Sequence, residues 1–109
     1  MAVYLSGESI KSGKQITMSS ETFAMYDHSA GVIWIQEGET MTARSAAYAS
    51  LLASANDTTA MLSEAAAGSV DAMVPLMNQK AQELGLGNTN FQNPFGFNNE
   101  NNYTSARDM

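Results

Sequence analysis

The sequence predicts a mainly α-helical fold with a small two-stranded β element. Two alanine-rich apolar runs meet at a short polar break, Ser54-Ala55-Asn56, which is typical of two helices joined by a tight connection. A third run, from Val70 onward, places apolar residues three and four positions apart, the spacing of one helical face. Residues 15–18 and 39–42 alternate polar and apolar side chains, so we expect them to pair as strands.

The composition is that of one small, acidic, globular domain. The chain has 109 residues, 44% of them apolar, which is enough for a single core. Its formal net charge is −6 and its five cationic side chains are scattered, so we expect no nucleic-acid partner. No apolar run approaches the length that spans a bilayer, so we expect no membrane segment in this chain.

The sequence is almost without the histidine and cysteine residues that bind metals or, for cysteine, act as thiol nucleophiles. Cysteine is absent, which excludes disulfides, thiol nucleophiles and cysteine metal ligands. The single histidine, His28, lies in a polar, turn-like stretch and is expected to be a surface loop residue, because a lone histidine is a poor metal site. We therefore expect neither a metal nor a cofactor.

The first part of the chain predicts short elements. Residues 1–10 read as a helix already under way, because no capping residue precedes them. Residues 19–25 are expected to form a helical turn capped by Ser19 or Ser20. The consecutive apolar residues 32–35 are the most β-like run, which requires burial on both sides or a strongly packed loop.

Three longer helices are expected next. Thr42 can cap the first, over residues 43–53, and Asn56 or Asp57 can cap the second, which ends at Gly68. The third covers residues 70–84. Its expected buried face consists of Val70, Met73, Val74, Met77, Ala81 and Leu84.

The third helix carries one favourable and one unfavourable signal. Gly85 followed by Leu86 predicts a Schellman-type end. Pro75 lies inside the helix, where it removes a backbone hydrogen bond and is expected to kink the helix unless it falls in the first turn.

Residues 88–103 are rich in asparagine and predict a long loop. Four aromatic residues are expected to pin it: Phe91, Phe95, Phe97 and Tyr103. Residues 104–108 resemble a helix start, because Ser105 and Asp108 have the spacing of a capping box.

Ser54 and Asn56 form the one grouping that suggests catalysis. On the pattern alone, helix capping by Asn56 is the favoured reading, because a Ser-x-Asn tripeptide arises by chance in many chains. Their significance depends on short blocks that occur in a fixed order: residues 37–39, 51–57, 66–69, 77–81, 84–86, 88–91, 93–96 and 103–109. With these blocks the chain resembles the low-molecular-mass penicillin-binding proteins, the serine D-alanyl-D-alanine carboxypeptidases of bacterial cell walls.

The resemblance implies a fold and a boundary. Such enzymes carry Ser-x-x-Lys, Ser-x-Asn and Lys-Thr-Gly motifs, and only the second is present, as Ser54-Ala55-Asn56. We therefore expect residues 1–109 to be a single internal fragment, cut at both ends. It would be the helical lobe of a β-lactamase/DD-peptidase-like fold whose main sheet is missing.

The resemblance also implies a function. The whole enzyme would remove the terminal D-Ala from peptidoglycan stem peptides through an acyl-enzyme, and it would bind β-lactams. Ser54 would relay a proton between two lysines, and Asn56 would hold the peptide group of the substrate. The location would be extracytoplasmic, in the periplasm or on the outer face of the bacterial membrane, with residues 28–31 near the rim of the cleft.

Two alternatives remain: a fragment of a class A β-lactamase, or of a non-catalytic penicillin-binding-protein-like scaffold. In any of these cases the chain alone is expected to be inactive. It is also expected to self-associate through apolar surface that a missing sheet would cover.

Overall fold

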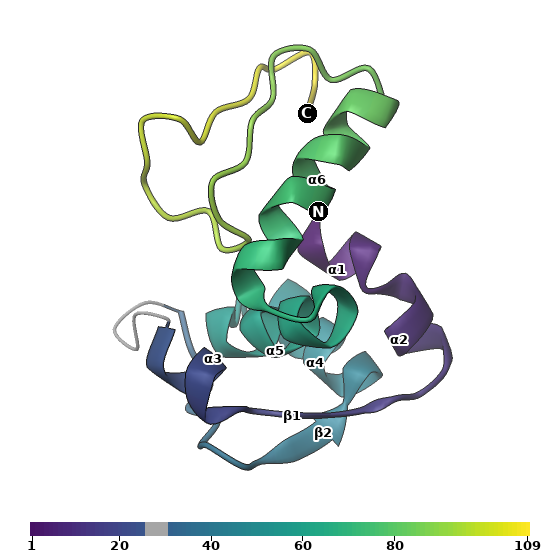
Figure 1. The fold of residues 1–109 in the computed structure, drawn as a ribbon, viewed down its shortest axis with the longest axis vertical. Helices are drawn as coiled ribbons and strands as arrows, with labels where there is room; N and C mark the ends of the chain where they lie inside the picture. Colours follow the sequence, from purple (N-terminus) through teal and green to yellow (C-terminus); the bar gives the residue numbers. More distant parts are fainter. Residues whose placement is uncertain (26–30) are drawn as a thin grey trace.

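The structure, a computed structural model, describes residues 1–25 and 31–109 (Figure 1). His28 therefore lies outside the described residues. The prediction of a mainly α fold with a small two-stranded sheet is confirmed. In chain order the elements are α1 (Ala2–Leu5), α2 (Gly7–Lys11), β1 (Gln15–Thr17), α3 (Ser20–Met25), β2 (Thr40–Thr42), α4 (Ala43–Leu52), α5 (Asn56–Ala67) and α6 (Val70–Glu83).

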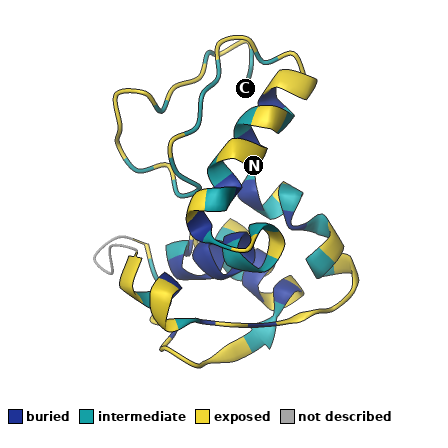
Figure 2. Ribbon diagram, viewed as in Figure 1, coloured by how far each residue is buried: buried dark blue, intermediate teal, exposed yellow. Residues whose placement is uncertain are grey.

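Helix α5 forms the centre of the molecule, and α1, α4 and α6 pack around it. Its residues 57 to 63 are all buried, so burial is concentrated in the middle of the fold (Figure 2). Small side chains permit this close packing, and their hydroxyls bond back to the helix. Ser63 Oγ donates to the Thr59 carbonyl at 2.8 Å, and Thr59 Oγ1 donates to the Ala55 carbonyl at 2.9 Å. Polar groups are thus buried without losing their partners.

For the last helix, α6, most of the predicted buried face and the predicted Schellman-type end are confirmed. Val70, Met73, Met77 and Ala81 are buried, whereas Leu84 is 57% exposed, contrary to expectation. Both bonds of a Schellman motif are present: Gly85 N donates to the Gln82 carbonyl and Leu86 N to the Ala81 carbonyl, each at 2.9 Å. Ser69 caps the helix start by accepting from Ala72 N at 3.1 Å. Helix α6 runs through Pro75 without a break.

The strand pairing is confirmed. β1 and β2 are antiparallel, with Ile16 opposite Met41. Thr42 ends β2 and caps α4, because its Oγ1 accepts from Ser45 N at 3.1 Å. Ser19 similarly caps α3 through a bond from Thr22 N at 3.0 Å.

Two expectations for the first part of the chain are wrong. Residues 1–10 do not form one helix, since Ser6 separates α1 from α2. Ser6 is buried, and its Oγ lies 3.0 Å from the Ala2 carbonyl and 3.2 Å from the Leu62 carbonyl, so it bonds within α1 and to α5. Residues 32–35 form neither a strand nor a fully packed loop, because Ile33 and Trp34 are exposed and Ile35 alone is buried.

The C-terminal segment also differs from the expectation. Residues 105–108 form a turn, not a helix. Ser105 Oγ accepts from Asp108 N at 3.3 Å, which is half of a capping box. The second bond of a capping box, from the Ser105 main-chain amide to the Asp108 carboxylate, is not formed. That carboxylate accepts from Asn88 N and from Thr89 Oγ1, each at 2.8 Å.

Candidate active-site cleft

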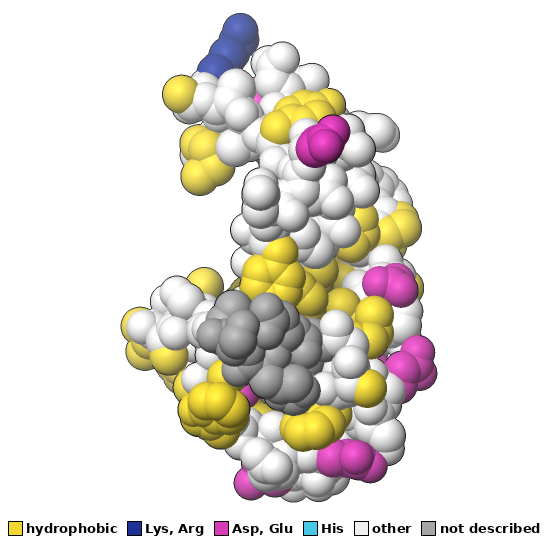
Figure 3. Space-filling model, turned by 90° about the vertical axis from the view of Figure 1, so that its left-hand side faces the viewer, with side chains coloured by type: hydrophobic (Ala, Val, Ile, Leu, Met, Phe, Trp, Pro, Cys, Tyr) yellow, Lys and Arg dark blue, Asp and Glu magenta, His cyan; other side chains and the backbone are white. Residues whose placement is uncertain are grey.

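The break between α4 and α5 places Ser54 and Asn56 on one cleft of about 450 Å³. The space-filling view is hollowed at mid-height, between the C-terminal part above and the helical body below (Figure 3). The described residues that line the cleft are Met1, Ala2, Val3, Gly31, Ser50, Ser54, Asn56, Thr59, Pro94, Phe95 and Phe97. Ser54 and Asn56 therefore line the same cleft as Phe95 and Phe97 of the asparagine-rich loop, residues 88–103.

Ser54 has a strained backbone. Its φ is +52°, in the left-handed region that costs a non-glycine residue about 1–2 kcal/mol. The next residue, Ala55, returns to an extended conformation and its amide donates to the Ala49 carbonyl at 3.3 Å. The reversal leaves the Ser54 side chain exposed beside the cleft. Strain of this kind is often concentrated at functional sites.

Asn56 does not cap α5, so the predicted capping role is wrong. Ala55 occupies the capping position and has no side-chain bond, while Asn56 is the first helical residue. The Asn56 amide donates to the Gly31 carbonyl at 2.6 Å. This backbone bond joins the start of α5 to the segment that comes before β2, and the carboxamide lines the cleft.

Asp57 is an important residue that the sequence reasoning considered only as a cap. Its side chain is fully buried, and its Oδ2 accepts from Ile33 N at 3.0 Å and from Ile35 N at 3.2 Å. Oδ1 accepts from Thr58 N at 2.9 Å. These bonds explain why residues 32–35 form no strand, because the carboxylate takes the amides that a neighbouring strand would use. In the sequence Asp57 lies in the polar stretch Asn56-Asp57-Thr58-Thr59 at a helix start, so no local signal separates a buried carboxylate from a cap.

Asn93 holds the loop that contributes Pro94, Phe95 and Phe97 to the lining of the cleft. Its Oδ1 accepts from three successive amides, those of Phe95, Gly96 and Phe97, at 3.1, 2.7 and 3.0 Å. Its Nδ2 donates to the Phe97 carbonyl at 3.1 Å. The rings of Phe95 and Phe97 lie 5.2 Å apart, centre to centre. The loop is thus held by the Asn93 side chain and by Phe91 and Phe95, which pack against the core, whereas Tyr103 is 56% exposed, contrary to expectation.

None of the described residues that line the cleft has an ionisable side chain. They offer hydroxyl and carboxamide groups, which can bind a peptide and pass on a proton but cannot by themselves act as a strong base. Among the described residues, no group of three or more histidine, cysteine or acidic side chains could hold a metal ion. Within the same residues, no helix has the length and hydropathy needed to cross a bilayer.

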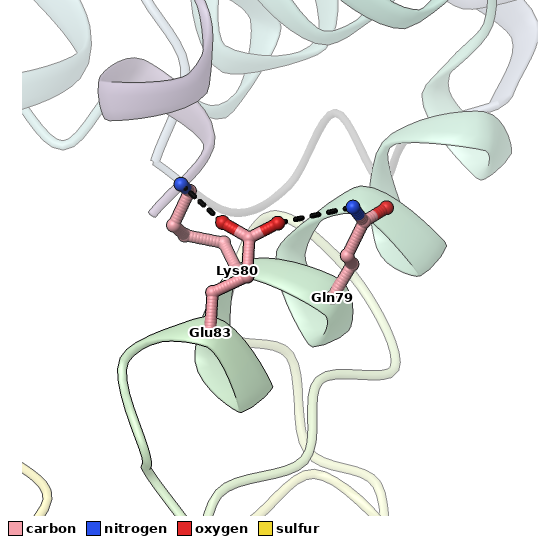
Figure 4. Close-up of polar contacts among 3 residues, drawn as sticks. All are labelled: Gln79, Lys80 and Glu83. Carbon is pink, nitrogen blue, oxygen red and sulfur yellow. Dashed lines mark hydrogen bonds and ion pairs between the residues drawn. The ribbon is translucent and has the colours of Figure 1, made fainter.

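A separate polar group lies on α6, away from the cleft lining. Lys80 and Gln79 both donate to the Glu83 carboxylate (Figure 4). The bond from Lys80 lowers the pKa of Glu83, and the bond to Glu83 raises the pKa of Lys80. Because the pair lies at the surface, solvent screening keeps its contribution to stability small. Lys80 Nζ also lies 6.0 Å from the centre of the Tyr4 ring on α1.

The fold matches the helical lobe of penicillin-binding proteins. Penicillin-binding protein 5 from Haemophilus influenzae superimposes with a TM-score of 0.86 at 28% identity, over 98% of this chain and 33% of that protein. The carboxypeptidase DacD from Francisella tularensis gives 0.84 at 28% identity, over 98% of this chain and 26% of that protein.

Sequence comparison identifies the family. The profile of D-alanyl-D-alanine carboxypeptidase matches residues 1–109, and the chain belongs to this family. It is 38% identical to D-alanyl-D-alanine carboxypeptidase DacF of Bacillus subtilis strain 168, and 32% identical to DacA of Escherichia coli strain K12. Each match covers 100% of this chain but only 28% and 29% of those proteins. The chain therefore spans less than a third of these curated relatives.

Proposed function

We propose that this chain is the helical subdomain of a serine D-Ala-D-Ala carboxypeptidase and supplies one wall of its active site. The observation that carries the proposal is that Ser54 and Asn56 line one cleft, in a chain whose whole length matches this family. The sequence contains neither Ser-x-x-Lys nor Lys-Thr-Gly, so the proposal assigns the nucleophile and the lysines to the rest of the full-length protein.

Ser54 and Asn56 have distinct roles in this proposal. Acyl transfer from a D-Ala-D-Ala peptide needs a base for the nucleophilic serine and an acid for the departing amine. The exposed hydroxyl of Ser54 can accept and donate a proton at once, so it can relay the proton between lysines. The Asn56 carboxamide offers both a donor and an acceptor, which suits the peptide group of the substrate.

The position of α1 fits this assembly. Met1 to Val3 line the cleft together with Ser54, so a segment joined to Met1 would start from the cleft wall. The substrates proposed for the full-length protein are peptidoglycan stem peptides, with β-lactams as their analogues, and the proposed location is outside the bacterial cytoplasm. Membership of the family supports both proposals.

Labelled penicillin tests the proposal. The full-length protein is expected to form a stoichiometric covalent adduct and to release D-Ala from a stem-peptide analogue. Ser54→Ala is expected to slow acylation by about 100-fold, the scale of a lost proton-transfer group. Asn56→Ala is expected to slow it by a similar factor, about 100-fold, because the substrate loses a positioning contact. Ser50→Ala is the matched control, since Ser50 lines the same cleft but bonds to Thr58 at 2.9 Å.

Three outcomes would contradict the proposal. Absence of any adduct on the full-length protein would favour a non-catalytic scaffold. Rapid hydrolysis of the β-lactam would favour a β-lactamase instead. An adduct on the 109-residue chain by itself would mean that the nucleophile lies within it.

A further inference from the structure

Asp57 follows the Ser54-Ala55-Asn56 turn directly in the chain and is a buried acidic residue. Its carboxylate is fully buried, and no ion pair to it is present among the residues that the structure describes. Three main-chain amides bond to it instead, from Ile33, Ile35 and Thr58. The first turn of α5 adds the favourable field of a helix N-terminus. Hydrogen bonds from these donors offset the cost of burying the carboxylate.

The carboxylate shapes the segment that it holds. Its Oδ2 binds the amides on either side of Trp34, whose φ is +67°. Trp34 is therefore turned outward and is 67% exposed. The Trp34 ring is exposed and its carbonyl accepts one local bond, from Gln36 Nε2 at 3.0 Å, so the two buried bonds to Asp57 are the main support for this strained conformation.

The first residue of this segment, Gly31, bonds to the Ser54-Ala55-Asn56 turn. Gly31 accepts from the Asn56 amide at 2.6 Å, and a Cβ built on Gly31 would lie 3.0 Å from the Ser54 carbonyl oxygen. Residues 31–35 are thus clamped twice, by the main chain of Asn56 and by the side chain of Asp57. Loss of the bonds to the Asp57 side chain would therefore let the bond between Gly31 and Asn56 shift.

We infer that Asp57 is a positioning residue, which locks residues 31–35 against the Ser54-Ala55-Asn56 turn and so fixes the placement of Ser54 and Asn56 toward the substrate. This inference rests on the proposed function. Asp57 does not touch the cleft, so it acts through its neighbours. A shift of about 1 Å in such groups is enough to slow a reaction about 100-fold.

Asp57→Asn in the full-length protein is the direct test. The carboxamide has the same shape, but one of its ends donates, so either orientation loses at least one of the three amide bonds. The acylation rate constant for labelled penicillin is expected to fall by about tenfold or more, with a smaller change in the dissociation constant of the initial complex.

Glu64→Gln is the matched control. Glu64 lies on the same helix, is half-buried, and accepts from Ser19 Oγ at 2.9 Å and Thr22 Oγ1 at 2.7 Å. It therefore anchors α3 rather than the Ser54-Ala55-Asn56 turn. The variant should lower the melting temperature but leave the acylation rate within about twofold. Equal loss of acylation in both variants would reduce Asp57 to a general stabilising residue and overturn the inference.

Amide hydrogen exchange tests the clamp without any activity. In the wild-type protein, the amides of Ile33, Ile35 and Asn56 are expected to exchange with one common protection factor, because the double clamp opens as a unit. Protection factors that differ by more than about tenfold would overturn the inference whether or not the Asp57 variant folds. A wild-type protein that exchanges as expected but is never acylated would instead overturn the proposed function alone.

Discussion

The main-chain carbonyl of Gly31 and the amide of Asn56 meet at 2.6 Å across the edge of the cleft. Gly31 has a φ of +52°, and an added Cβ would approach Ser54 O to 3.0 Å and Asn56 Nδ2 to 3.3 Å. A side chain at this position would therefore press directly on both residues assigned to the reaction.

Gly31→Ala is expected to destabilise the protein by about 1–2 kcal/mol from the left-handed backbone alone, and by more because the Ser54 oxygen belongs to the main chain. Gly38→Ala separates these effects. Gly38 has a φ of +81° with nothing near its added Cβ, so it carries the backbone strain only. Denaturant unfolding should show the difference, and only Gly31→Ala should slow acylation by penicillin.

Pro75→Ala is expected to stabilise the chain. Pro75 is exposed and lies in the interior of α6, where it cannot donate to the Asp71 carbonyl. The helical gain of up to about 3 kcal/mol is offset in part by the greater freedom of the unfolded chain, so a net gain of about 1–2 kcal/mol is expected. The neighbouring variant Leu76→Ala, at a partly exposed position, should not raise the midpoint of denaturant unfolding.

Acid is expected to release the C-terminal turn. The bond from Thr89, together with the Asn88 amide, lowers the pKa of Asp108. A carboxyl whose pKa is lower in the folded state adds stability above the unfolded value of about 4, and this stability is lost as pH falls through the folded value. The amide resonances of Asn88 and Asp108 should shift together below about pH 4.

The control for this titration is Asp108→Asn, which removes the charge. Its Asn88 resonance should no longer follow pH in that range. An unchanged pH response in the variant would assign the titration to another carboxyl.

The isolated chain is expected to self-associate. On α4, Tyr48, Leu51 and Leu52 are 61%, 67% and 83% exposed, which leaves a large apolar surface beside the Ser54 turn. Light scattering should show a mass that rises with concentration. The double variant Leu51→Gln and Leu52→Gln should reduce it, whereas Leu84→Gln, at the far end of α6, should not. A strictly monomeric wild-type chain at high concentration would contradict this.

Local signals predicted much of the fold. The end of α6 just before Gly85 and the cap of α4 at Thr42 depend on residues close in sequence, and the alternation within each strand indicated β1 and β2. The Ser54 and Asn56 pair was found through ordered blocks of sequence rather than through its own pattern. The structure places both on one cleft, while their catalytic roles stay a prediction.

Long-range bonds caused the misses. Residues 32–35 have the composition of a strand, but their amides bond to Asp57, which is more than twenty positions away. Ser6 interrupts the first helix where its hydroxyl reaches Leu62 on α5. Such competition between a side chain and regular backbone pairing cannot be read from periodicity, because it depends on which segments the fold brings together.

The bonds made by Asn93 have a consequence for ligand affinity. One side chain fixes three amides and a carbonyl between Phe95 and Phe97, so this loop is ordered before any ligand arrives. Ordering a free side chain on binding commonly costs about 0.5–1.5 kcal/mol. A peptide that contacts these two rings meets a preorganised surface, and more of its contact energy appears as affinity.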